Sequence, residues 1–230
     1  MRRFIRFVGF RILWNVRITG AENIPDTGPA VLMMNHISLL DPVLCMGAVT
    51  NRFVIPMTKI ENLQNPLLNP FIRWWGAYSV TRGEVDRRAL TNSIELLKSG
   101  QLILIAPEGT RQHNGLTRPK EGLAYIATKA NAVIIPAAIS GAAGWERNLL
   151  RLKRTKVDVN FGRPFRFAPP DNTRAAREAL PKMMEEAMYQ LALAVTDPQG
   201  RGVYADTDKA TTEYLNFLTE REIHPSRLSE

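Results

Sequence analysis

The sequence predicts an α/β domain with a largely parallel central sheet flanked by helices, an N-terminal amphipathic helix and a C-terminal helical extension. Short apolar runs alternate along the chain with longer stretches of helical periodicity, the order typical of such domains. Several apolar runs are followed at once by polar residues, as occurs where parallel strands end beside a ligand. The 230 residues, 45% of them hydrophobic, suffice for one sizeable domain with its own core.

The expected strands are the short apolar runs at residues 30–34, 52–56, 77–80, 102–106, 132–137 and 157–161. The expected helices are the longer periodic stretches at residues 2–16, 42–49, 84–98, 120–130, 172–195 and 207–221. This order divides the chain into an amphipathic helix over 1–19, an α/β core over 20–168, and a helical extension of the same domain over 169–230.

Local signals support several of these boundaries. Asp41-Pro42 is typical of a helix N-cap followed by proline at the first helical position. Thr81 and Glu84 have the spacing of a capping box, and Gly100 is suited to end the helix that follows them. Pro169-Pro170-Asp171 separates the sheet-forming part from a pair of C-terminal helices.

The first twenty residues are basic and contain no acidic residue. A helical wheel gathers four apolar side chains on one face, those of Ile5, Val8, Ile12 and Val16. It places four arginines opposite them, namely Arg2, Arg3, Arg6 and Arg17. This pattern is typical of a helix lying in a membrane interface. The alternative is a helix that packs its apolar face on the core and leaves its arginines in solvent.

The net charge of +8 calls for an acidic partner, which is nucleic acid, anionic lipid or a phosphorylated substrate. A second basic cluster consists of Arg147, Arg151, Lys153, Arg154 and Lys156. Apolar residues beside the basic ones favour lipid, and the sequence carries no nucleic-acid-binding signature. No apolar run approaches the roughly 18 residues of a spanning helix. We therefore expect a peripheral protein on the cytoplasmic face of an anionic cell membrane, with no nucleic-acid partner.

Cysteine and histidine usage restricts the chemistry. Cys45 is the only cysteine, which excludes an intrachain disulfide and a cysteine-based zinc cluster and favours a reducing compartment. The histidines His36, His113 and His224 lie in dissimilar contexts, so no metal site is expected.

His36 follows an expected strand and is the natural general base, because a neutral imidazole accepts a hydroxyl proton near neutral pH. A carboxylate on the other ring nitrogen would fix the tautomer and stabilise the imidazolium. Asp41 would lie about 140° from His36 on a continuous helix, so we expect His36 in a turn that folds back onto a helix beginning at Asp41. Taken alone, the pair favours a simpler interpretation, a polar turn residue and a helix cap.

Arg82, Glu108 and Arg111 also follow expected strands. If those strands are parallel neighbours, the three side chains meet His36 at one edge of the sheet. The arginines suit a phosphate, Glu108 suits a polyol, and Gly109 lets the backbone approach a ligand. Each residue alone is equally compatible with an ordinary surface turn.

As a set, these residues resemble four sequence blocks of the glycerolipid acyltransferase family. Residues 35–41, NHISLLD, are similar to its N-H-x-x-x-x-D block, and residues 107–111, PEGTR, match the core of F-P-E-G-T-R. Residues 76–82 resemble the block of a glycine, an apolar run and an arginine, and residues 135–139 the apolar block around a proline. The four blocks stand in family order over roughly residues 20–165, which makes the set specific.

The resemblance implies transfer of a fatty acyl group from an acyl thioester, acyl-CoA or acyl carrier protein, to the sn-2 hydroxyl of 1-acylglycerol-3-phosphate. It implies that His36 is the base and Asp41 its partner, with no cofactor and no metal. Lys59 and Lys120 also stand where the family tends to carry a lysine. The implied substrate-binding residues are Lys59, Arg82, Glu108, Gly109, Thr110, Arg111 and Lys120.

Two departures from the family pattern leave the acceptor open. Ala106 replaces the usual aromatic of the third block, and the residues before Arg82 lack the acidic residue often found there. Both departures lie close to the expected acceptor, so another lysophospholipid, a glycolipid or an aminolipid is an alternative substrate. An alternative of another class is a non-enzymatic peripheral membrane protein built on the basic N-terminus.

Overall fold

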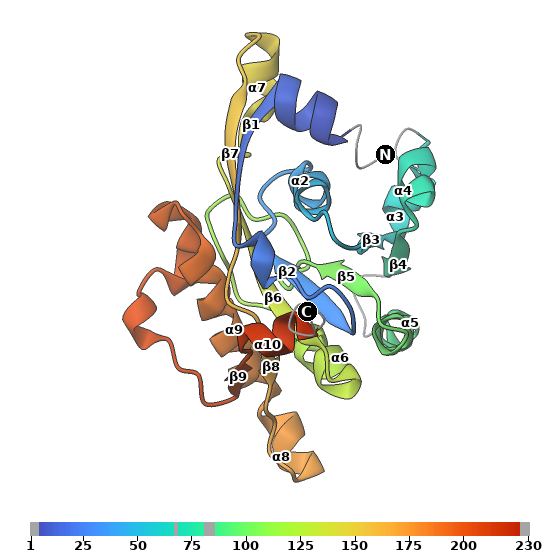
Figure 1. Ribbon diagram of the computed structural model, residues 1–230, viewed down its shortest axis with the longest axis vertical. Coiled ribbons are helices and arrows are strands. Elements are labelled where there is room, and N and C mark those ends of the chain that lie inside the picture. The colour runs from blue at the N-terminus through green and yellow to red at the C-terminus, as the bar shows by residue number, and fades with distance from the viewer. Residues whose placement is uncertain (1–4, 67–68, 81–85, 226–230) are drawn as a thin grey trace.

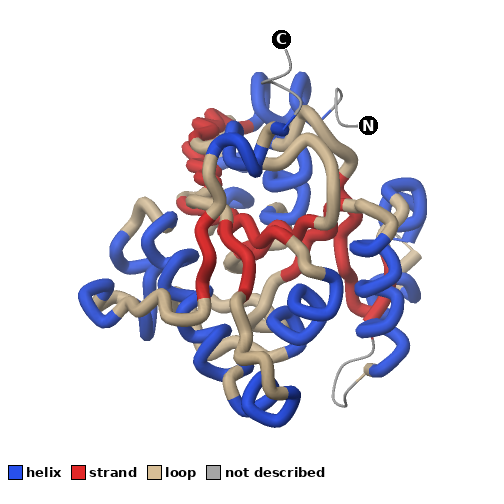
Figure 2. The backbone as a smooth tube through the Cα atoms, turned by 60° about the horizontal axis from the view of Figure 1, so that its bottom comes forward, coloured by secondary structure: helices blue, strands red, loops and turns tan. Residues whose placement is uncertain are grey.

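A nine-stranded sheet forms the centre of the molecule and carries helices on both faces (Figures 1 and 2). The computed structural model describes residues 5–66, 69–80 and 86–225. The main path of the sheet is β1-β7-β6-β2-β5-β3-β4, and β8 and β9 extend from β6. The strands are β1 (Trp14–Thr19), β2 (Ala30–Met34), β3 (Val54–Lys59), β4 (Tyr78–Val80), β5 (Leu102–Ile105), β6 (Val133–Ser140), β7 (Thr155–Phe161), β8 (Phe165–Phe167) and β9 (Leu215–Phe217).

The helices vary widely in length. The α-helices are α2 (Asp41–Ala48), α3 (Ile60–Gln64), α4 (Asn69–Trp75), α5 (Arg87–Lys98), α6 (Gly122–Ala130), α7 (Trp145–Leu150), α8 (Thr173–Glu178), α9 (Leu180–Ala194) and α10 (Glu220–Ile223). The 3₁₀ turns are η2 (Ala21–Asn23), η3 (Pro198–Tyr204) and η4 (Thr207–Lys209), and η1 (Ile5–Leu13) is a wider π-type helix. No helix in the described ranges is long and apolar enough to span a membrane.

The predicted parallel core is confirmed. Strands β6, β2, β5, β3 and β4 run parallel to one another, β7 is antiparallel to β6, and β1 is parallel to β7. All six predicted strands are present, with ends that differ by a few residues. Every residue of β2 is buried, as expected for a central strand covered on both faces.

Alternate residues of β2 supply two separate core layers, because successive side chains of a strand point to opposite faces. Val31 and Met33 pack in the layer that holds α6 and α9. Leu32 and Met34 pack in the layer that holds α2. The two layers lie on opposite sides of the sheet, and the polar residues Asn35 and His36 begin where β2 ends.

Most predicted helices are also present. Helices α2, α5 and α6 match three of the predictions, and the stretch 172–195 forms α8 and α9, which meet at Ala179. Helix α5 begins at Arg87 behind Asp86, whose carboxylate accepts a hydrogen bond from the Ala89 backbone N–H at 2.9 Å. The predicted capping box of Thr81 and Glu84 lies outside the described residues. Helices α3, α4 and α7 were not predicted.

The predicted N-terminal helix is too long. Helix η1 ends at Leu13, and residues 14–19 form β1, which pairs with β7 from Trp14 to Thr19. The cause is visible in the alternation of apolar and polar residues over 14–19, which buries Trp14 and exposes every second side chain. The sheet therefore begins before the predicted boundary at residue 20.

The second predicted C-terminal helix, over 207–221, is wrong. This stretch contains η4, the strand β9, which pairs antiparallel with β8, and the start of α10. The cause lies in α9, where the carboxylate of Glu186 is completely buried. It accepts hydrogen bonds from Thr211 Oγ1 at 2.6 Å, Glu213 N at 3.0 Å and Tyr214 N at 2.9 Å. Backbone N–H groups held by this carboxylate do not form helical bonds.

Glu186→Ala is expected to lower the free energy of unfolding by about 2–4 kcal/mol, because buried donors lose their acceptor. Urea unfolding measures the effect. Glu185→Ala is the matched control, since its half-exposed side chain makes only a surface ion pair with Lys182 at 3.4 Å and is expected to change stability by less than about 1 kcal/mol. Equal losses in the two variants would contradict the anchoring role of Glu186.

Candidate active site

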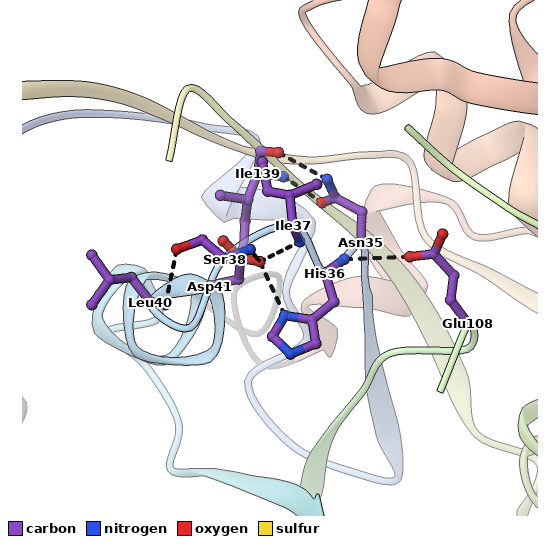
Figure 3. A network of polar contacts seen from close by, with 8 residues as sticks. All are labelled: Asn35, His36, Ile37, Ser38, Leu40, Asp41, Glu108 and Ile139. Atoms are coloured by element: carbon purple, nitrogen blue, oxygen red, sulfur yellow. Dashed lines mark hydrogen bonds and ion pairs between the residues drawn. The ribbon is translucent and has the colours of Figure 1, made fainter. Parts of the chain in front are cut away.

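The candidate site lies at the edge where the central parallel strands end. β2 is followed by Asn35 and His36, and its neighbour β5 is followed by the loop that carries Glu108. β3, on the far side of β5, ends at Lys59. The predicted meeting of His36 and Glu108 is present, since the His36 backbone N–H donates to Glu108 Oε2 at 3.4 Å (Figure 3).

Asn35 fixes the start of the loop that carries His36. Its side chain is buried and makes a pair of hydrogen bonds with the backbone of Ile139 on β6. Asn35 Nδ2 donates to the Ile139 carbonyl at 2.9 Å, and Ile139 N donates to Asn35 Oδ1 at 2.7 Å (Figure 3). This pair continues the contact between β2 and β6 beyond the last residue of β2, so the chain leaves the sheet at a defined point.

Asp41 holds the loop in the predicted fold-back. Its Oδ2 atom accepts hydrogen bonds from Ile37 N and Ser38 N, each at 2.6 Å, and lies 3.0 Å from His36 Nδ1 (Figure 3). Helix α2 begins at Asp41, with Leu40 at the N-cap position. The carboxylate therefore binds the preceding loop and does not act as the predicted N-cap of its own helix.

The geometry determines which nitrogen of His36 can accept a proton. A carboxylate only accepts hydrogen bonds, so in the neutral ring the hydrogen sits on Nδ1 and the lone pair on Nε2. Asp41 is wholly buried, and the His36 side chain keeps 18% of its surface exposed. The ring is thus anchored on one nitrogen and reachable by solvent, an arrangement suited to a general base.

Glu108 is more deeply buried than a substrate-binding carboxylate was expected to be. Only 5% of the residue is exposed, and burial raises the pKa of its carboxyl, an effect that hydrogen bonds from Thr117 and His36 partly offset. Thr117 donates to Oε1 from its backbone N–H at 2.8 Å and from its hydroxyl at 3.3 Å, while His36 N donates to Oε2. The carboxylate thus ties two loops together beside the imidazole.

The loop after β5 brings the other predicted residues to the same edge. Gly109 has φ +72°, and a Cβ built there would meet the side chain of Lys120 at 3.2 Å. Gln112 N donates to the His36 carbonyl at 2.7 Å, which holds the adjacent Arg111 next to the His36 loop. Both Thr110 and Arg111 are exposed.

Among the described residues, Lys59 is the predicted residue that no recorded contact joins to this cluster. Lys59 is half-buried at the end of β3, with β5 between its strand and β2. Arg82 lies outside the described residues. Asn35 and Thr117 were missed as site residues, although Asn35 stands inside the quoted block. A polar residue directly after five buried apolar ones was the available signal for Asn35, whereas nothing in the sequence links Thr117 to Glu108.

Comparison with known proteins places this chain in a family. The family model described as Acyltransferase matches residues 15–140. The 1-acyl-sn-glycerol-3-phosphate acyltransferase of Borreliella burgdorferi is 33% identical over 53% of this chain and 50% of its own length. The enzyme of the same name from Bacillus subtilis is 27% identical over 76% of this chain and 89% of its own length. The chain thus spans only half of the first relative and most of the second.

The fold is shared with a solved structure, that of the 1-acyl-sn-glycerophosphate acyltransferase PlsC from Thermotoga maritima. The TM-score is 0.58, with 24% sequence identity over 81% of this chain and 77% of the other. The family match includes β2, the His36 loop and the loop after β5. The α/β fold, the ordered blocks and the matched region agree, and the chain belongs to the Acyltransferase family.

Proposed function

We propose that this protein transfers a fatty acyl group from acyl-CoA or acyl carrier protein to the sn-2 hydroxyl of 1-acylglycerol-3-phosphate, giving phosphatidic acid. The observation that carries the proposal is the 3.0 Å contact between His36 Nδ1 and Oδ2 of the buried Asp41. The names of the curated relatives support the choice of acceptor.

In the proposed reaction, Nε2 of His36 takes the proton of the acceptor hydroxyl as its oxygen attacks the thioester carbonyl. Asp41 stabilises the imidazolium through Nδ1. Collapse of the tetrahedral intermediate breaks the C–S bond, and the imidazolium returns its proton to the departing thiolate. An ester and a free thiol result, with no acyl-enzyme and no cofactor.

The remaining site residues are proposed to bind the acceptor. We propose that Arg111, which is exposed and precedes Gln112, whose N–H binds the His36 carbonyl, holds the phosphate of an acceptor whose hydroxyl meets His36. Lys120, which lies over Gly109, and Lys59 add positive charge at the same edge. Arg82 and Thr110 complete the proposed binding set. The acceptor is a lipid, so we propose that the protein acts while attached peripherally to an anionic membrane on its cytoplasmic side.

Glu108→Gln is expected to lower kcat by about tenfold to a hundredfold and to leave the KM for the acceptor within about twofold. The carboxylate accepts hydrogen bonds on both oxygens, whereas the amide has only one oxygen. The variant therefore loses either the hydrogen bond from His36 N or the one from Thr117 N. Steady-state kinetics with varied acceptor measure both constants.

The control for this variant is Glu121→Gln, which changes an exposed glutamate that makes no side-chain cap of helix α6. Its kinetics are expected to match those of the unchanged protein. A raised KM with an unchanged kcat in Glu108→Gln would contradict the positioning role and favour direct contact between Glu108 and the acceptor.

Arg111→Ala is expected to raise the KM for a phosphorylated acceptor by about tenfold, because a charge-assisted hydrogen bond to phosphate is lost. The exposed Arg118, further along the same loop, provides the control variant Arg118→Ala. An unchanged KM in Arg111→Ala would indicate that the acceptor is not phosphorylated or is held elsewhere.

The proposed function is tested with purified protein, one acyl-CoA and a panel of acceptors. Lysophosphatidic acid is expected to be acylated fastest, ahead of other lysophospholipids, glycolipids and aminolipids. Preference for a different lipid would support acyl transfer but change the proposed acceptor. Ala106, which stands where the family usually has an aromatic residue, would help to explain that result. Absence of transfer to every acceptor, from both acyl-CoA and acyl carrier protein, would overturn the proposal.

A further inference from the structure

The segment between β6 and β7 projects three leucines into solvent. This segment, residues 145–154, is called here the α7 tip, since it consists of α7 and the turn after it. Leu149 is 44% exposed, Leu150 85% and Leu152 94%. Single exposed leucines are ordinary, but three within four positions form an apolar patch, and two of them, Leu150 and Leu152, are almost fully exposed.

Hydrogen bonds within the tip and from the tip to the start of β7 fix the turn that carries the leucines. Asn148 Nδ2 donates to Oγ1 of the buried Thr155 at 3.2 Å, and Lys153 N donates to the Asn148 carbonyl at 2.8 Å. Leu152 has φ +52°, a conformation that costs a non-glycine residue free energy. The turn therefore exposes a leucine in a backbone conformation that itself costs free energy. A glycine or asparagine would be more stable here if the position contacted only water.

The leucines are surrounded by positive charge. The tip contains a single acid, Glu146, and four cations, which are Arg147, Arg151, Lys153 and Arg154. All four cations are exposed. Arg154 also fastens the tip to the N-terminal helix, because its Nη2 donates to the carbonyls of Phe10 at 3.1 Å and Trp14 at 2.7 Å. Figure 1 shows α7 and the blue helix η1 side by side at one end of the molecule.

The tip emerges from the same edge of the sheet as His36. β6 is parallel to β2, so both strands end at this edge, and Asn35 contacts Ile139 just before β6 ends. β7 is antiparallel to β6 and starts here, and β1 is parallel to β7, so η1 enters the sheet from this edge as well. A flat partner that contacts the tip and η1 would therefore lie at the edge of the sheet that carries the His36 loop.

We propose that the α7 tip is a membrane-docking element that inserts Leu150 and Leu152 into an anionic lipid surface while its cations contact the headgroups. Apolar side chains at the point and cations around them are the arrangement that an anionic bilayer interface binds. Nucleic acid would contact the cations and leave the leucines in water. The inference rests on the proposed function only for the choice of a membrane as the partner.

The test measures partitioning of the full chain onto phosphatidylcholine vesicles with and without phosphatidylglycerol. Leu150→Gln/Leu152→Asn is expected to lower the partition coefficient on the anionic vesicles by about tenfold or more. Asparagine tolerates the positive φ of position 152, and both side chains are exposed, so the variant is expected to fold. Arg151→Gln/Lys153→Gln is expected to weaken binding to anionic vesicles only.

The matched control is Leu193→Gln/Val203→Asn, which removes two exposed apolar side chains, 51% and 64% exposed, from another part of the molecule. Its partition coefficient is expected to stay within about twofold of the unchanged protein. Equal losses in the leucine variant and the control, or no loss in either, would overturn the proposal. The proposal would also be overturned if the protein bound single-stranded RNA as strongly as vesicles and the Leu150→Gln/Leu152→Asn variant lost that binding.

A second measurement reports insertion directly. The only native cysteine, Cys45, is completely buried, and burial raises the pKa of its thiol, so Leu152→Cys can be labelled selectively with an environment-sensitive dye. The emission is expected to shift to shorter wavelength on anionic vesicles, whereas the same label in Val203→Cys is expected not to shift. Equal shifts at both positions, or none at 152, would contradict insertion.

These readouts are independent of acyl transfer, so the two proposals can fail separately. If the protein binds vesicles through the tip but acylates no acceptor, the proposed function fails and the docking surface stands. The docking proposal fails alone if two results are found together. The unchanged protein and the Leu150→Gln/Leu152→Asn variant would acylate a short-chain, water-soluble acceptor at the same rate, and they would have the same partition coefficient on vesicles.

Discussion

His36→Ala is expected to lower kcat by about a thousandfold or more while the protein stays folded. General-base catalysis typically contributes about 10²–10⁴-fold, and here the same ring is proposed to return the proton to the leaving thiolate. Loss of the imidazole therefore affects both halves of the reaction. The ring keeps 18% of its surface exposed and contacts Oδ2 of Asp41 through Nδ1, so we expect little packing to be lost with it.

The measurement is acyl transfer from acyl-CoA under saturating acceptor, with thermal unfolding of each variant alongside. His113→Ala is the matched control, since His113 is exposed in the loop after β5. It is expected to keep full activity. Turnover within about tenfold of the unchanged protein in His36→Ala would remove the general-base assignment, because a base that contributes so little falls below the usual range.

The sequence was sufficient to predict the central sheet and the edge of the sheet where His36 and Glu108 lie. β2 and β5 are continuous apolar runs; Asn35 and His36 directly follow β2, and Glu108 comes three residues after β5. Parallel neighbouring strands bring the residues that follow them to the same edge of the sheet. The helical face predicted over residues 2–16 was extended too far because Val16, an apolar position of β1, also lies four residues after Ile12 and so continues the face of Ile5, Val8 and Ile12. Pairing with β7, about 140 residues away, stabilises the strand, whose side chains alternate every two residues, over the helix, whose faces repeat every 3.6 residues.

The polar connections of the site could not be predicted in the same way. The spacing of His36 and Asp41 is compatible with a turn, a cap or a pair, and only the direction of the 36–38 backbone selects the pair. Glu108 was expected to bind the substrate, which stays a prediction; its hydrogen bonds from His36 and Thr117 were not predicted. The burial of a carboxylate depends on which loops cover it. The local sequence pattern does not show the positions of those loops, because they are fixed only when the whole chain folds. Glu186, which organises the C-terminal strand, was missed for the same reason.

Asp41→Asn is expected to lower kcat by about 10²–10⁴-fold with little change in KM. The amide oxygen can replace Oδ2, keeping the acceptor for Ile37 N, Ser38 N and His36 Nδ1. The position of Oδ1, which is buried without a hydrogen-bond partner, then receives the amide nitrogen. The loop geometry is retained, while the negative charge that stabilises the imidazolium is lost. The variant therefore separates the charge of Asp41 from its anchoring of the loop.

Asp41→Ala removes both contributions at once. Three donors lose their acceptor, so we expect the free energy of unfolding to fall by about 2–5 kcal/mol in addition to the loss of activity. Urea unfolding of Asp41→Asn, Asp41→Ala and the unchanged protein separates the two effects. The stability of Asp41→Asn is expected to lie between the other two, because one buried amide nitrogen gains no partner.

Ser38→Ala is the matched control within the same loop. Ser38 Oγ accepts a hydrogen bond from Leu40 N at 3.2 Å, so this variant disturbs the loop without touching the imidazole or its carboxylate. It is expected to keep kcat within about tenfold, which also excludes Ser38 as an acylated nucleophile. If Asp41→Asn and Ser38→Ala lose activity equally, loop geometry and not charge explains the effect. Near-normal turnover in Asp41→Asn would leave His36 acting without a charged partner and confine Asp41 to holding the turn.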